Sequence, residues 1–283
     1  FRMSISEIDD LSITRWYVKP VKKVKPTLPE AKTNFHQLFK DSVRLRLQAD
    51  VPLGTGLSGG MDSSSIACEI NAVLKSQGKD DLQKTFSAYT KVKKYDERNY
   101  ISDVLDTITA EPHFVELMCP DKRSILEEVV WHQDEPFGTT SIFAEWSVFK
   151  LAKSNNVKVT LDGHGADETL AGYHRFFFVY LIELLKNGKI VRFYREVTAL
   201  HKLHNYNGAR VVKTILYLMK NAFFSKDKDH GWWKLDKDSI EVSKMHFSIL
   251  EESKYQLFNT SVPMQLHWCD RDSMAHSVES RAP

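Results

Sequence analysis

Cysteine is scarce in this chain: Cys68, Cys119 and Cys269 are its three cysteines, and they are far apart with no C-x-x-C pair. A disulfide framework and a structural zinc site are therefore both disfavoured. No run of apolar residues reaches the roughly 18 to 20 that a membrane span needs. The formal net charge of +2 is too balanced to indicate nucleic acid or a membrane as a partner. We expect a cytoplasmic enzyme, without membrane or nucleic-acid binding.

Three common functional motifs are also missing. The sequence has no GxxxxGK[ST] phosphate loop, no GxGxxG dinucleotide fingerprint and no H-E-x-x-H metal site among its eleven histidines. The usual kinase, GTPase, dehydrogenase and zinc-protease classes are therefore disfavoured. The first residues show no charged segment followed by a long apolar run, so no signal peptide is expected. Both ends look cut, which suggests a portion of a longer protein.

Short apolar runs alternate with helical patterns over the first two thirds of the chain. Strand-like runs are expected before LSGG and at "KTFSAYT", "HFVEL" and "VKVTLDG", with helices at 63–74 and in "DERNYISDVLDTIT", "DKRSILEEVVWHQDE" and "IFAEWSVFKLAKSNN". Such alternation predicts an α/β fold, a parallel sheet flanked by helices. Active sites in such folds collect at the carboxyl ends of the strands.

The remaining segments predict the domain organisation. Residues 1–34 end in a stretch rich in lysine, valine and proline, which favours a linker or connector. Residues 35–283 are expected to form one domain, α/β to about residue 175 and mainly helical over 176–283. The polar, lysine-rich segment 223–238 is expected to be a loop.

The stretch "LSGGMDSSS", Leu57 to Ser65, lies where the first strand pattern turns into a helix pattern. Paired glycines allow a tight turn, and serine hydroxyls with a helix N-terminus supply donors for phosphate oxygens. Asp62 would repel phosphate unless a cation lies between them, so its presence indicates Mg²⁺. A serine-rich helix cap explains the same residues without any ligand.

Two further segments narrow the choice between a ligand-binding loop and a helix cap. "LDGHGADETLAGYHRFF" (161–177) follows a strand pattern, and "DRDSMAHSVESRAP" (270–283) ends the chain. The first stretch resembles the pyrophosphate loop of the ATP pyrophosphatase (PP-loop) superfamily. All three together resemble the synthetase domain of glutamine-hydrolysing asparagine synthetases, from about Phe35 to Pro283. The resemblance implies an adenine nucleotide alpha hydrolase-like fold that cleaves ATP between its α and β phosphates.

The resemblance also implies roles for particular residues. Leu57, Ala88 and the backbones of Asp162 and Gly163 would contact adenosine. Asp62 and Asp167 would ligate Mg²⁺. The pyrophosphate group would be held by Ser58, Gly59, Gly60, Asp62, Ser63 and Ser64.

Two positions depart from the family pattern. His164 stands where an acidic residue is usual; a neutral imidazole could accept a proton, an imidazolium could bind phosphate, or the side chain could merely hydrogen-bond the loop. Arg271 stands where the family often has a lysine that stabilises the α-phosphate. Arginine keeps the positive charge but carries it on a planar guanidinium group. Glu279 and Arg281 are expected to form a structural pair.

The implied activity is an ATP-dependent, amide-forming ligase. It would activate the aspartate side-chain carboxylate as an acyl-adenylate, and ammonia from glutamine would then give asparagine, AMP and pyrophosphate. The expected partners are these small molecules and an N-terminal glutaminase domain, with a homodimer left open. The His164 departure keeps open a related amidotransferase or cyclase for a sugar acid, peptide or β-amino acid. A non-catalytic ATP- or AMP-binding module is a third reading, which Ser58, Asp62 and Asp167 argue against.

Overall fold

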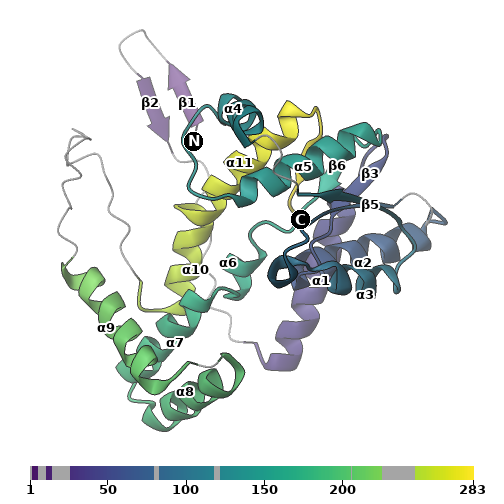
Figure 1. The fold of residues 1–283 in the computed structure, drawn as a ribbon. Helices are drawn as coiled ribbons and strands as arrows, with labels where there is room; N and C mark the ends of the chain where they lie inside the picture. Colours follow the sequence, from purple (N-terminus) through teal and green to yellow (C-terminus); the bar gives the residue numbers. More distant parts are fainter. Residues whose placement is uncertain are drawn as a thin grey trace. The chain divides into compact units, whose positions relative to one another are not determined.

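A computed structural model describes residues 2–5, 11–14, 26–79, 83–117, 122–204, 206–224 and 246–283 of the chain (Figure 1). Two compact units are present, Phe1–Asp41 and Ser42–Pro283. The first unit contains a hairpin of β1 (Arg2–Ile5) and β2 (Leu11–Thr14), paired antiparallel. Helix α1 (Leu28–Arg46) begins in the first unit and ends in the second. The first two residues of the loop expected over 223–238 are instead the end of a helix, Gly208–Phe224, and residues 225–238 lie outside the described residues, as does Cys119.

The second unit is built on a five-stranded sheet in the order β5-β4-β3-β6-β7, with every neighbouring pair parallel. Its strands are β3 (Leu53–Gly56), β4 (Lys84–Tyr89), β5 (Glu111–Glu116), β6 (Val159–Leu161) and β7 (Glu279–Arg281). The chain builds outward from β3 through β4 to β5, then returns to place β6 on the other side of β3. The β3–β6 boundary is therefore the topological switch point, where α/β sheets open a crevice for ligands.

Helices cover both faces of this sheet (Figure 1). Helix α2 contacts β3 and α3, while α5 contacts β4, β5 and α11. The helices of this α/β part are α2 (Met61–Ser76), α3 (Arg98–Leu105), α4 (Lys122–Gln133), α5 (Ser141–Ser154) and α11 (Ser261–Ala275), with a 3₁₀ turn at Lys93–Tyr95. Phe86 and Phe149 are almost completely buried between sheet and helix. The predicted parallel sheet flanked by helices is confirmed.

A mainly helical part follows, as expected. It consists of α6 (Ala166–Leu170), α7 (His174–Lys186), α8 (Ile190–His204), α9 (Gly208–Phe224) and α10 (Ile249–Phe258). Helices α7, α8 and α9 share a core of their own, centred on Phe178, Leu181 and Leu200. The aromatic run that begins at Phe176 therefore serves mainly packing.

The C-terminal strand β7 was not predicted from the sequence. Glu279, Ser280 and Arg281 pair in parallel with β6, so the third motif completes the sheet. Arg281 Nε bonds Glu279 Oε1 at 2.8 Å, and its Nη1 donates to the carbonyls of Arg46 and Gln48. Glu279 and Arg281 thus form the structural pair that was expected.

Candidate functional site

The motif loop follows β3 directly at the switch point. Its turn needs glycine at Gly59, whose φ is +80° and whose added Cβ would lie 2.8 Å from Tyr100 Cβ. The serines then tie the loop together, because Ser58 and Ser63 hydroxyls lie 3.1 Å apart and Ser63 Oγ donates to Gly60 O. Gly60 is the N-cap of α2 and has no side chain to cap the helix, while its own N–H donates to Ser58 Oγ at 3.3 Å. The N-cap position itself is therefore not held by a serine or by Asp62.

The second motif follows β6 on the other side of the crevice. Asp162 Oδ2 accepts hydrogen bonds from Thr160 Oγ1 at 2.8 Å and Ser280 Oγ at 2.7 Å, and burial raises the pKa of this carboxyl. Gly163 packs against α2, because a Cβ there would lie 3.2 Å from Asp62 Cβ. The segment that begins at Asp162 is thus held against the segment that begins at Ser58.

A cavity of about 670 Å³ lies between these loops. Most of the predicted ligand-binding residues line it: Leu57, Ser58, Gly60, Asp62, Ser63, Ala88, Asp162, Gly163, His164 and Asp167. Gly59 and Ser64 do not line it; Gly59 shapes the turn, and Ser64 Oγ is buried without a hydrogen-bond partner in the described part of the chain. We call this space the motif cavity.

The carboxylates of Asp62 and Asp167 lie on one wall of the motif cavity. Burial raises the pKa of Asp62, and the negative charges of Asp167 and Glu168 raise it further. Burial also raises the pKa of Asp167, with the charge of Glu168 adding to it. Negative charge is therefore concentrated here without full compensation, and hard carboxylate oxygens are the ligands that Mg²⁺ takes in proteins.

His164 forms a close pair with Glu145 of α5, a residue that the motif analysis missed. Its Nε2 lies 2.9 Å from Glu145 Oε1, and both side chains are about three-quarters buried. Burial alone would lower the pKa of His164, but the hydrogen bond and charge of Glu145, aided by the charge of Asp162, raise it to about 9. At neutral pH the ring is therefore an imidazolium.

One sequence signal could have revealed Glu145. It lies three residues after Ile142 and four before Phe149, both of which are almost fully buried. An acidic residue on the apolar stripe of a helix must find a partner, because an isolated buried charge is costly. The structure supplies that partner from another motif.

Arg271, on α11, lies outside the motif cavity. Its Nη2 pairs with Asp134 Oδ2 at 3.0 Å, and both side chains are largely exposed. It does not line the motif cavity. The structure thus does not bring Arg271 together with the other predicted site residues, and its catalytic role stays a prediction.

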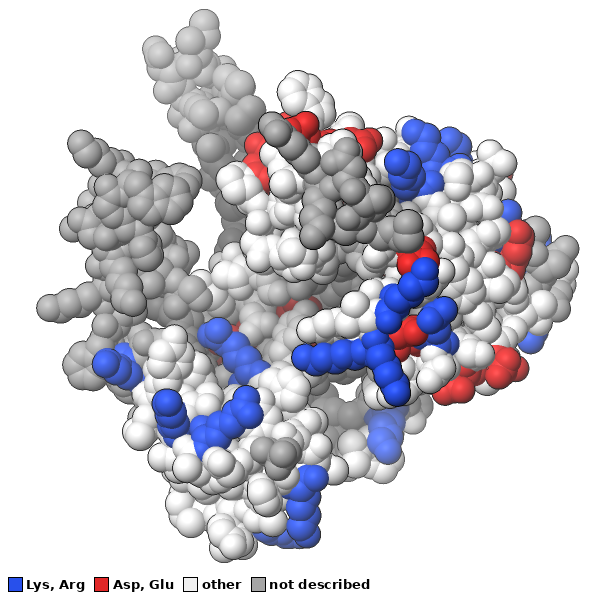
Figure 2. All heavy atoms as spheres, in the orientation of Figure 1, with Lys and Arg blue, Asp and Glu red and all other residues white. Residues whose placement is uncertain are grey.

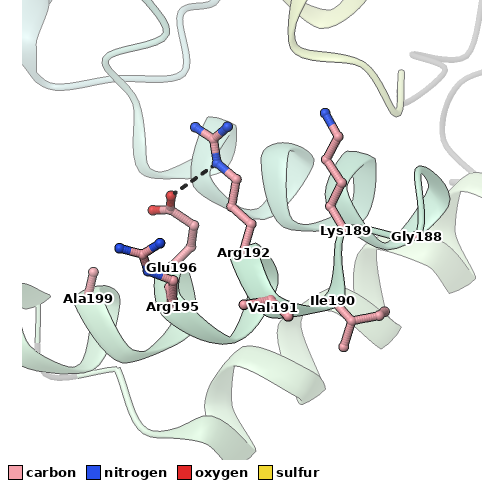
Figure 3. Close-up of a pocket in the computed structure, with 8 residues that line it drawn as sticks. All are labelled: Gly188, Lys189, Ile190, Val191, Arg192, Arg195, Glu196 and Ala199. Carbon is pink, nitrogen blue, oxygen red and sulfur yellow. Dashed lines mark ion pairs between the residues drawn. The ribbon is translucent and has the colours of Figure 1, made fainter.

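Another cavity lies away from the motif residues. A cavity of about 800 Å³ lies along α8 and the turn before it, lined by Lys189, Arg192 and Arg195 among others (Figure 3). Arg192 Nε lies 3.8 Å from Glu196 Oε1 across one turn of the helix. No motif residue lines this space, and basic and acidic side chains are interspersed in small groups over the face in Figure 2. The motif cavity at the switch point, which the motif residues line, is therefore the candidate functional site.

These features define an α/β protein with a glycine- and serine-rich loop and a carboxylate pair at the switch point of a parallel sheet. Residues 34–283 match the family model described as asparagine synthase. The chain belongs to this asparagine synthase family.

Curated relatives agree with that assignment. A Methanocaldococcus jannaschii protein with the provisional name asparagine synthetase 2 (glutamine-hydrolysing) is 32% identical over 77% of this chain and 41% of its own length. The glutamine-hydrolysing asparagine synthetase 1 of Bacillus subtilis is 30% identical over 58% of this chain and 25% of its own length. The chain thus spans less than half the length of these relatives.

A solved structure, the U34-tRNA thiolase NcsA of Methanococcus maripaludis, is similar at a TM-score of 0.36 and 14% identity, over 88% of this chain and 81% of that one. That likeness is too low to support a shared function. Among the described residues, no helix is long and apolar enough to cross a membrane.

Proposed function

We propose that this chain is the ATP-dependent, amide-forming part of a ligase that works in the cytoplasm. One observation carries the proposal: the SGGMDSS loop after β3 and the DGHGADE segment after β6 line a single cavity at the sheet's switch point. Family membership supports the same class of reaction. The alternative of a non-catalytic nucleotide-binding module would not need the carboxylate pair Asp62 and Asp167 facing that cavity.

The motif cavity suits ATP in one orientation. Leu57, Ala88 and the backbone of Asp162 and Gly163 lie at the strand ends, where the adenosine would bind. The loop from Ser58 to Ser64 would hold the pyrophosphate group through backbone N–H groups, hydroxyls and the N-terminus of α2. Asp62 and Asp167 would hold Mg²⁺, which, when bound, supplies positive charge to the phosphate oxygens.

The reaction has two displacements. A substrate carboxylate oxygen attacks the α-phosphorus, the bond from that phosphorus to the bridging oxygen breaks, and pyrophosphate leaves with the electron pair. Ammonia then attacks the acyl carbon, the bond to the AMP oxygen breaks, and the amide, AMP and one proton are released. The loop donors assist the first step because they face the charge that develops on the leaving group; each such donor is worth about 2.7 to 4 kcal/mol.

His164 would act as a fixed cation in this scheme. Because its ring is protonated at neutral pH, it is poorly suited to accept a proton and well suited to bind an anionic oxygen. Its position on the cavity wall beside Glu145 allows it to orient the substrate carboxylate or the α-phosphate. Of the roles open from the sequence, anion binding is the one that we propose.

The acid and the nitrogen source follow from the relatives. Because they are named glutamine-hydrolysing asparagine synthetases, aspartate is the first acid to test, with ammonia supplied from glutamine by an N-terminal glutaminase domain. The second candidate is a ligase for another carboxylate. The acid-to-histidine change at His164 favours it, because that change alters the charge next to the acid. The protein could work as a homodimer.

A direct assay tests the proposal. The full-length protein is incubated with ATP, Mg²⁺, ammonium chloride and aspartate, and both pyrophosphate and asparagine are measured. Aspartate-dependent release of both supports asparagine synthesis. Release of pyrophosphate only with a different acid selects the second candidate, and ATP binding without pyrophosphate release by any acid would refute the ligase.

A further inference from the structure

A second cavity adjoins the motif cavity through a shared wall. It measures about 640 Å³, a size typical of small-molecule sites, and shares Ser141, Glu145 and His164 with the motif cavity. The loop before α5, the first turns of α5 and one face of α11 enclose the rest of it. A group bound here would therefore meet a nucleotide in the motif cavity across the Glu145–His164 pair. We call this space the side cavity.

Part of the lining of the side cavity is apolar. Ile142, Met264 and Trp268 line it, and Ile142 and Trp268 also pack in the core cluster between α4, α5 and α11. The Met264 side chain is 46% exposed, so it borders the space without being locked in the core. These side chains offer a bound molecule dispersion contacts and burial of apolar surface.

Polar groups of this wall are fixed by one buried acid. Glu168 is fully buried, and its Oε1 accepts hydrogen bonds from Tyr173 OH at 3.1 Å and Gln265 Nε2 at 2.9 Å. Ser261 Oγ also donates to that oxygen. Tyr173 and Gln265 are therefore held in place. Because Gln265 Nε2 already donates toward Glu168, Ser261 and Tyr173, the Tyr173 oxygen is the group left to accept a hydrogen bond from a neutral donor such as an amide N–H.

Charge is confined to the shared wall. His164 and Glu145 pair there at 2.9 Å, so a carboxylate approaching His164 would find a positively charged partner beside the nucleotide. Free aspartate would bring an ammonium and a second carboxylate into a cavity whose other lining side chains, Ile142, Met264 and Trp268 among them, carry no charge. Placing unpaired charges against such side chains is unfavourable.

We propose that the side cavity binds the acid substrate, and that this acid carries an uncharged body with apolar or aromatic groups behind its reacting carboxylate. A peptide-like acid, with amide groups near Gln265 and a hydrophobic side chain near Met264, has the chemistry that the cavity offers. This inference rests on the proposed ligase function and narrows its substrate class. It predicts that free aspartate is a poor substrate.

The first test measures binding by calorimetry, in the absence of ATP. The probes are N-acetyl-aspartyl-phenylalanine amide, N-acetyl-aspartate amide and free aspartate; the two capped acids have the same single carboxylate and differ by the aromatic residue. Because burial of the phenyl side chain favours binding, the aromatic acid should bind about tenfold or more tightly than the shorter one. Free aspartate should bind more weakly than either.

Two methionine variants on the same helix provide the control. Met264→Gln should weaken binding of the aromatic acid about fivefold and leave N-acetyl-aspartate amide unchanged, because it replaces an apolar contact of the side cavity. Met274→Gln alters a side chain that is 58% exposed and outside the cavity, and should change neither affinity. Both exposed positions should tolerate the change without loss of folding.

The outcomes separate the two proposals. Equal affinity for the two capped acids, tighter binding of aspartate, or no effect of Met264→Gln would overturn the assignment of the side cavity, whatever the pyrophosphate assay gives. Preferential binding of the aromatic acid without pyrophosphate release by any acid would instead refute the ligase function, and leave an acid-binding cavity. Preferential binding together with acid-dependent pyrophosphate release would support both.

Discussion

Replacing Glu145 with glutamine tests the charge state of the site. The pKa of His164 is about 9 in the folded protein, against an ordinary value of 6.5. The difference of 2.5, at 1.36 kcal/mol for each pKa unit, corresponds to about 3 kcal/mol of preferential binding of the proton. Burial acts in the opposite direction, so Glu145→Gln should lower this pKa, although the charge of Asp162 remains.

The free energy of unfolding depends on pH through the same raised pKa of His164. Because the folded-state pKa of His164 is raised, its contribution to the free energy of unfolding is fully present below pH 6.5 and is lost as pH rises through about 9. A double-mutant cycle of Glu145→Gln and His164→Gln should therefore give a coupling energy on the order of 3 kcal/mol at pH 6, and almost none at pH 10.

Nuclear magnetic resonance of histidine-labelled protein measures the pKa directly, with His164→Gln used to assign the signal. Denaturant unfolding of the four proteins in the cycle gives the coupling energy. If His164 in the Glu145→Gln variant still titrates above pH 8, or if the coupling is unchanged between pH 6 and pH 10, the reasoning about this pair is wrong.

Three further changes test the remaining assignments. Asp62→Ala should abolish turnover, and Mg²⁺ should no longer raise the melting temperature; near-normal turnover would rule out the metal role. Gly172→Ala would make a Cβ clash with Asp167 Oδ1, so that carboxylate must move, and the Mg²⁺ concentration needed for half-maximal activity should rise. A circular dichroism spectrum like that of the wild type would show that the fold is retained. Arg271→Gln removes a partly exposed ion pair with Asp134 and should change stability by less than about 1 kcal/mol. A fall in turnover at unchanged stability would support the predicted catalytic role of Arg271, and unchanged turnover would refute it.

Local sequence determined most of the fold and of the candidate site. The alternation of apolar runs and helices predicted a parallel sheet, and the strand–SGGMDSS–helix order predicted where the loop would lie, because both patterns follow from local periodicity and turn chemistry. The strand at Glu279–Arg281 was not predicted, because it has only three residues and becomes a strand only by pairing with β6. Metal-binding and catalytic roles at Asp62, Asp167 and His164 remain predictions.

Tertiary structure alone decided which distant residues share the site. Glu145 reaches His164 because α5 packs over the sheet beside the switch point, whereas Arg271 lies near Asp134 although its motif resembles that of a catalytic residue. The side cavity likewise arises from α5 and α11 meeting around residues that are more than a hundred positions apart. Sequence periodicity reports which face of a helix is buried, and only the packing of one helix on another determines what that face meets.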